Sequence, residues 1–195
     1  QAATQLTTTD SNVTFGGTVD ANVAGTETLQ LTIGTGSADF QGIVGGTRAL
    51  GSLTVDATAT EARFQAAVTT TGNQSVTATT IRTAGTNAAT GAGSAITFTG
   101  NAALDAATTL NAPNAAGNVE ITGTVDGDAA AAGPYSLTVD AGSGRAIFGG
   151  AIGNGLDPLA SLSVTSTNAG VDAIELGGNI DTDGATSAVT FTGNV

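Results

Sequence analysis

The stretch Asp39-Phe40-Gln41-Gly42-Ile43-Val44, followed by Leu50-Gly51-Ser52-Leu53-Thr54-Val55, decides the fold. An apolar strand-like segment leads through glycine to Val or Ile, and a Leu-x-Val segment comes next. The same phrase recurs at residues 13–19 with 29–33 and at residues 148–152 with 159–164. Self-similarity at a spacing of roughly 20–50 residues is typical of solenoids, in which each repeat buries its apolar face only against its neighbours.

The composition favours a narrow strand-lined interior and an acidic surface. Only 4% of the 195 residues are aromatic, Trp and Met are missing, and 29 residues are Gly. Small β-branched residues and Thr suit stacked strands, and glycine suits the turns between them. Sixteen acidic residues face four arginines, with no Lys or His, for a net charge of −12. We therefore expect no nucleic-acid partner, and no membrane insertion because no apolar stretch is long enough.

Spacing predicts how the strands stack. Phe15, Phe40 and Phe64 follow one another at steps of 25 and 24 residues (40 − 15 and 64 − 40). Period-two alternation predicts that Phe15, Gly17 and Val19 share one face. These features predict an all-β, right-handed parallel β-helix (β-solenoid) of about 7–8 rungs of roughly 24 residues. The alternative is an antiparallel sandwich, which also has evenly spaced short strands. We further expect a single stacked spine of the six phenylalanines: Phe15, Phe40, Phe64, Phe98, Phe148 and Phe191.

The two halves of the chain match each other. Residues 13–20 match 119–126, and Ile96-Thr97-Phe98-Thr99-Gly100-Asn101 is nearly repeated at 189–194. We therefore predict one solenoid domain over 1–195, built from two imperfect repeats of about 1–102 and 103–195, the first with an extra turn around residues 74–82. The two ends are complementary in pattern, which favours a segment of a longer array or a self-stacking subunit over an independent domain. The predicted assembly interface is Val13, Phe15, Val19, Val189, Phe191 and Val195.

Residues 188–195 and 159–164 resemble the β-strand repeats of bacterial β-helical exoproteins, namely filamentous-haemagglutinin-like adhesins and autotransporter passenger domains. The resemblance implies an extracellular or cell-surface stalk or fibre that acts in adhesion or self-association. Its partners would be itself, head to tail, or adjacent repeats of a longer chain. The alternative function is a glycan- or calcium-binding adhesin stalk, with glycans or a neighbouring cell surface as partners.

Catalytic chemistry is not predicted. Without His, Cys or Lys there is no base for a serine nucleophile and no common zinc site, and the acids are scattered. We predict no catalytic or cofactor-binding residue and no enzyme activity. Calcium is the one cofactor considered: the acidic pairs Asp126/Asp128 and Asp181/Asp183 are weak metal candidates, against the simpler interpretation of solvated turns. Thr-x-Thr pairs recur, for example at Thr97/Thr99 and Thr190/Thr192. They could form a flat ladder of hydroxyl groups with a function of its own, or they could reflect only that Thr is common in strands.

Overall fold

The computed structural model shows a parallel β-solenoid of about seven turns of roughly 24 residues, which confirms the predicted fold class. It describes residues 3–114, 116–127, 134–153, 158–170, 172–183 and 188–195, and no helix occurs within these ranges. The strands are β1 (Ala3–Thr7), β2 (Val13–Phe15), β3 (Thr28–Thr32), β4 (Ala38–Phe40), β5 (Ser52–Phe64), β6 (Val68–Thr70), β7 (Gln74–Ala89), β8 (Ile96–Asn111), β9 (Val119–Ile121), β10 (Val125–Gly127), β11 (Ser136–Asp140), β12 (Ala146–Phe148), β13 (Ser161–Thr165), β14 (Ile174–Leu176) and β15 (Val189–Thr192).

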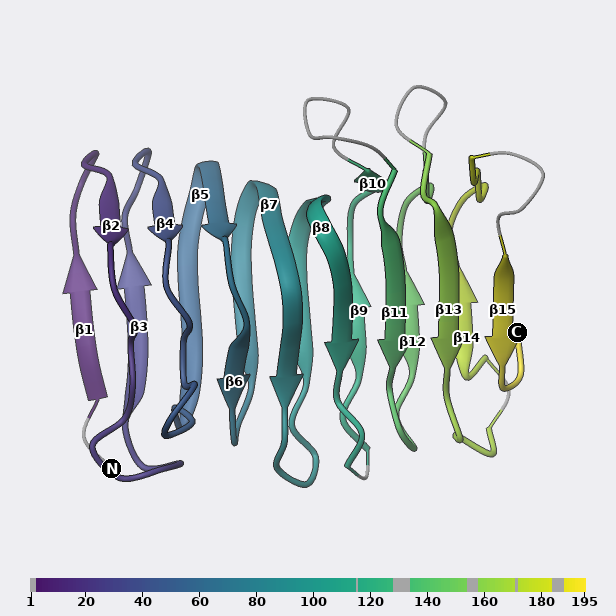
Figure 1. Ribbon diagram of the computed structural model, residues 1–195, viewed down its shortest axis with the longest axis horizontal. Helices are drawn as coiled ribbons and strands as arrows, with labels where there is room; N and C mark the ends of the chain where they lie inside the picture. Colours follow the sequence, from purple (N-terminus) through teal and green to yellow (C-terminus); the bar gives the residue numbers. More distant parts are fainter. Residues whose placement is uncertain (1–2, 115, 128–133, 154–157, 171, 184–187) are drawn as a thin grey trace.

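The coil is right-handed. In Figure 1 strands such as β9 and β12 run up behind, whereas β8, β11 and β13 run down in front. Because the chain also advances from left to right, this direction of winding is that of a right-handed coil.

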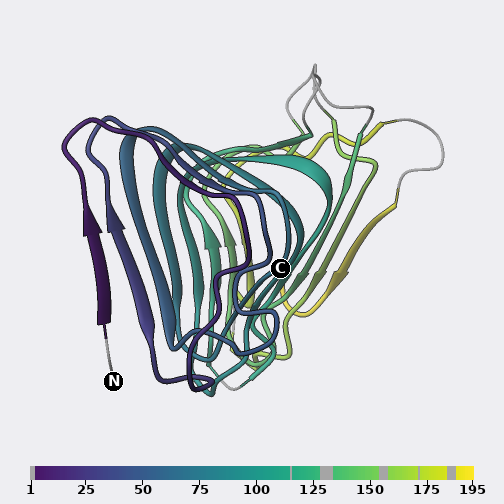
Figure 2. The same cartoon turned by 60° about the vertical axis from the view of Figure 1, so that its left-hand side comes forward.

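Each turn has three faces, and every strand pair between turns is parallel. Face A stacks β1, β3, the starts of β5, β7 and β8, then β9, β12 and β14. Face B stacks β2, β4, the end of β5, the middle of β7 and β8, then β10 and the bridges at Ile152 and Ile180. Face C stacks Val19, Val44, β6, the ends of β7 and β8, then β11, β13 and β15. Figure 2 shows successive coils lying one behind another, with the chain taking a similar course in each.

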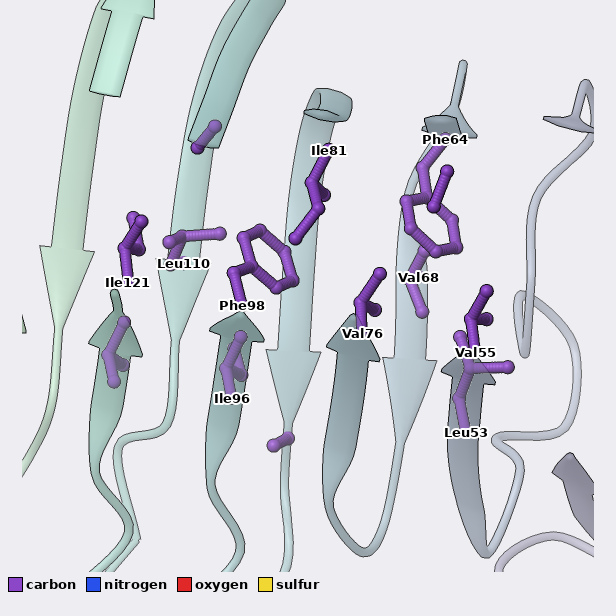
Figure 3. Packing of buried hydrophobic residues seen from close by; sticks show 14 of the residues in the cluster. Leu53, Val55, Phe64, Val68, Val76, Ile81, Ile96, Phe98, Leu110 and Ile121 are labelled. Carbon is purple, nitrogen blue, oxygen red and sulfur yellow. The ribbon is translucent and has the colours of Figure 1, made fainter. Parts of the chain in front are cut away.

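The core is built by alternation. In β3 the leucines Leu29 and Leu31 point inward and are buried, whereas Gln30 between them is exposed. Their register partners on the next turn are Leu53 and Val55, so like side chains stack on like. Figure 3 shows side chains from all three faces pointing into one interior. Since each rung buries its apolar residues mainly against the rungs on either side, stability rises with the number of stacked rungs.

The prediction of a single phenylalanine spine is wrong. Phe15, Phe40 and Phe64 do stack on face B, with ring centroids 4.8 Å and 5.0 Å apart. That column then continues through Thr83 and Leu104. Phe98 and Phe148 stand instead on face A, on either side of Ile121, and Phe191 stands on face C. Three faces give several inward columns, and spacing along the chain does not tell which column a residue joins.

The expectation that Phe15, Gly17 and Val19 share one face is also wrong. Strand β2 ends at Phe15, and Val19 pairs with Val44 on face C rather than with the column of Phe40 on face B. The chain turns the corner at Gly16 and Gly17. The two glycines therefore mark a corner, although the alternation of side chains continues across it.

Matched segments of the two halves lie on different faces. The 31–33 segment continues face A, whereas its match at 137–139 is on face C. The 13–15 segment is on face B and its match at 119–121 is on face A. Residues 52–55 and 96–99 on face A match 161–164 and 189–192 on face C. All four pairs are displaced by one face in the same sense, because the intervening chain makes a number of turns that is not whole.

Candidate functional site: the two ends of the solenoid

The arginines on the sides of the solenoid connect its rungs. Arg63 Nε donates to Asp105 Oδ2 at 2.9 Å, and Arg82 Nη2 lies 2.5 Å from Asp105 Oδ1. Arg145 Nη2 lies 2.6 Å from Glu175 Oε2, and Arg48 Nη1 donates to the carbonyl of Asn22. Asp105 is the most buried of these carboxylates, with a side chain 10% exposed. All four arginines therefore have an oxygen partner on another rung, and they do not form a shared site for an anionic ligand.

Two acids hold corner loops. Asp20 Oδ1 accepts hydrogen bonds from the backbone N–H groups of Thr47 and Arg48 on the next turn, at 2.9 Å and 3.2 Å. The Thr47 bond is the main cause that lowers the pKa of Asp20 below its usual value, and the Arg48 bond adds to it. Glu27 accepts from the Thr26 hydroxyl and the Val23 N–H, and the hydroxyl bond is the main cause that lowers its pKa. Both carboxylates stabilise the corner in their charged form.

Sequence reasoning missed a buried polar cluster in the rung formed by β7. Gln74 is 1% exposed, and its amide donates to the carbonyls of Ala88 at 2.8 Å and Val68 at 3.3 Å. Asn87 Nδ2 donates to Thr83 Oγ1 at 2.8 Å in the same interior. Polar residues at inward positions of the alternation could have signalled the cluster. Both amide nitrogens have acceptors, and no side-chain atom of Gln74, Thr83 or Asn87 is buried without a hydrogen-bond partner, so the cluster is a satisfied part of the core.

The structure does not assemble the calcium candidates into a site among the residues it describes. Asp128 lies outside the described residues. Asp126 and Asp181 follow Val125 and Ile180, which lie on face B on either side of Ile152, and the Thr124 hydroxyl donates to Asp126 Oδ2 at 2.7 Å. In the described ranges, Asp183 included, no three acidic, His or Cys residues converge on a common point. Calcium binding stays a prediction.

The threonine pairs do not share a plane. Thr97 and Thr99 face outward from face A, whereas Thr190 and Thr192 face outward from face C. Outward hydroxyls stack from rung to rung along face C, in the column Thr86, Thr109, Thr138, Ser163 and Thr190. The one-face displacement of matched segments therefore splits the threonine pattern between two sides of the molecule.

The first end of the solenoid exposes a strand edge and a set of apolar residues. Strand β1 pairs only with β3 and β2 only with β4, so the other edge of each has no partner among the described residues. All five residues of β1 are exposed, and Leu6 is 37% exposed. Val13, Phe15 and Val19 pack on the core from one side only and are partly buried. Three of the predicted interface residues thus lie together on this end, with Leu6 as an addition that the sequence did not indicate.

The second end is formed by β14, Ile180 and β15. Within the described chain β15 pairs only with β13 and β14 only with β12. Val189 is 43% exposed and Val195 66%, whereas Phe191 is partly buried against the core. After β15 the chain turns at Gly193, and the carbonyl of Asn194 accepts from Ile174 N–H on face A at 2.8 Å. Val189, Phe191 and Val195 therefore occupy the opposite end from Val13, Phe15 and Val19, as Figure 1 shows for their strands.

No helix in the described part of the chain has the length and apolar character needed to cross a membrane. No protein-family model, curated protein or solved structure matches the chain.

Proposed function

We propose that this protein is a structural element of an extracellular bacterial fibre or giant adhesin, in which β-solenoid units stack end to end through their terminal strands. The observation that carries the proposal is the parallel edge at each end that has no strand partner among the described residues and is lined by partly buried apolar residues. An exposed edge presents a row of backbone donors and acceptors that is a template for another strand.

The end strands lack the features that protect edges from pairing. Neither the sequence ATQLT of β1 nor the sequence VTFT of β15 contains a charged residue or a proline. Natural sheets usually block such edges with Lys, Pro, a bulge or a covering segment. The absence of these devices from both strands favours pairing at the ends over protection from it.

The sides of the solenoid have the opposite character. The chain carries a net charge of −12, and its arginines are engaged between rungs. Like-charged sides repel one another, whereas apolar ends with open backbone groups attract. This distribution supports growth along the axis rather than lateral aggregation. The extracellular and adhesive parts of the proposal rest on the resemblance of residues 159–164 and 188–195 to bacterial exoprotein repeats.

The test is assembly of the purified chain, followed by sedimentation and electron microscopy. We expect long particles of the width of one solenoid at high protein concentration. Val189→Lys places a charge on the open end and should abolish assembly. Thr138→Lys places the same charge on an exposed side position of β11 and should leave assembly intact. Monomers at every concentration, or equal effects of the two variants, would contradict stacking through the ends.

A further inference from the structure

A five-residue phrase occurs at two places with the same glycine φ. Thr97-Phe98-Thr99-Gly100-Asn101 lies within β8, and Thr190-Phe191-Thr192-Gly193-Asn194 begins in β15 and ends one residue before Val195. Gly100 has φ 140° and Gly193 has φ 141°, values that glycine adopts far more readily than other residues. The identical sequence and the matching glycine φ make the first phrase a template for the second, with an offset of 93 residues (190 − 97).

Inside the chain the first phrase is already covered by another rung. Ile96 pairs with Val119 and Phe98 with Ile121, both on face A, and Ala102 pairs with Val125 on face B. The covering residues match the first end of the chain, because Val119, Ile121 and Val125 lie 106 residues beyond Val13, Phe15 and Val19 (119 − 13). The covered residues match the second end of the chain. Ile96, Phe98 and Ala102 correspond, 93 residues further on, to Val189, Phe191 and Val195.

We infer that the second end binds the first end of another copy of this chain in this internal register. Val189 then pairs with the next copy's Val13, Phe191 with its Phe15, and Val195 with its Val19. Strand β15 on face C carries β2, which belongs to face B, so each copy is rotated by one face relative to the one below. The inference deepens the proposed function and rests on it.

A glycine that the isolated chain does not need supports this register. A Cβ on Gly17 would meet nothing within 4 Å, and its φ lies outside the left-handed region. At the matching Gly123, a Cβ would lie 2.3 Å from Asn101 Oδ1 and 2.5 Å from the Gly100 carbonyl. In the inferred joint Gly17 meets Asn194 and Gly193 of the copy below, the matches of Asn101 and Gly100. The open glycine therefore provides the close approach that a stacked rung requires.

The inferred joint also continues the aromatic column. Phe15 already stacks on Phe40 at 4.8 Å with rings 8° from parallel, and Phe191 would extend the stack by one ring. Stacking without rotation would follow the face C column instead, in which Val44, Val68 and later Val164 lead to Phe191. It would place the next copy's Val19 on Phe191 and Thr18 beside Thr190. The two joints thus give Thr190 different neighbours.

Cysteine cross-linking distinguishes them in a chain that has no native cysteine. Adjacent parallel strands lie about 4.8 Å apart, within the Cα separation that a disulfide spans. In the inferred joint Thr190 stands beside the next copy's Thr14, as Thr97 stands beside Glu120. The variant T14C/T190C should therefore give a reducible ladder of covalent multimers on oxidation. The matched variant T18C/T190C, which fits the unrotated joint, should assemble in the same way but give no covalent ladder.

Each outcome is informative. A ladder from T18C/T190C, or wild-type filaments with no ladder from either variant, would overturn the joint while leaving end-to-end stacking in place. Failure of the unmodified chain to assemble would overturn the proposed function and the joint with it.

Gly17→Ala provides a second measurement. The side chain fits the isolated fold, so the melting temperature of the monomer should not change. It clashes with Asn194 in the joint, so the concentration needed for filaments should rise by roughly tenfold or more. An unchanged assembly concentration would count against the register.

Discussion

At the residue scale, the same type of side chain contributes more to the free energy of unfolding in the middle of the stack than at its end. Phe40 is 1% exposed between Phe15 and Phe64, whereas Phe15 has a ring on one side only. We expect Phe40→Ala to lower the free energy of unfolding by about 3–5 kcal/mol, the usual cost of removing a buried phenylalanine. Phe15→Ala should cost clearly less in the monomer. Urea unfolding of the two variants measures the difference, and equal losses would show that end and middle rungs are equally packed.

Asp20 is one residue whose protonation should lower the stability of the fold at acid pH. Its pKa is lowered in the fold, chiefly by the Thr47 N–H and then by the Arg48 N–H. A lowered pKa contributes stability that is fully present above the unfolded value of 3.8 and is lost as pH falls through the folded value. Asp20→Asn should therefore lower the melting temperature at pH 7, and the gap to wild type should close below pH 3.8. A gap that does not change with pH would argue against this role.

At the scale of elements, corners decide how strands stack. Gly45 turns the chain after Val44 with φ 69°, and a Cβ there would lie 2.1 Å from the Thr69 carbonyl on the next turn. Gly45→Ala combines backbone strain with a clash between rungs, so we expect a loss of roughly 1–3 kcal/mol or more. Gly17→Ala is the matched control in the monomer because its site is open. Thermal unfolding compares them, and a tolerated Gly45→Ala would show that the corner can move away from Thr69.

At the scale of the whole molecule, charge opposes the stacking that the ends favour. Two copies of a chain with net charge −12 repel each other, and salt screens the repulsion, with a Debye length of about 30 Å at 0.01 M and about 8 Å at 0.15 M. The mean sedimentation coefficient at fixed protein concentration should therefore rise between these salt concentrations. A fall would mean that the joint is held by attraction between opposite charges rather than by apolar and backbone contacts.

The sequence predicted much of the local structure of this protein. The recurring phrase located the segments that form β3 and β13, and the spacing of Phe15, Phe40 and Phe64 predicted the length of a rung. The six residues predicted to form an interface lie at the two ends, and their role in assembly stays a prediction. The buried amides of Gln74 and Asn87 were missed, because alternation marks an inward position without telling which polar partner it meets. The single phenylalanine spine was wrong for a related reason: Phe98 and Phe191 follow the same local pattern as Phe40 but stand on other faces.

Strand and turn propensities act over a few residues, so the sequence by itself determined the β-solenoid class and the approximate length of a rung. Its composition determined the acidic character. Only the tertiary structure decided which face each strand occupies and that matched segments, such as 52–55 and 161–164, are displaced by one face. The physical reason is that face assignment depends on the sum of all preceding corner angles. Gly16 and Gly17 turn the chain onto a new face without breaking the period-two pattern, and each such corner shifts every later strand around the axis.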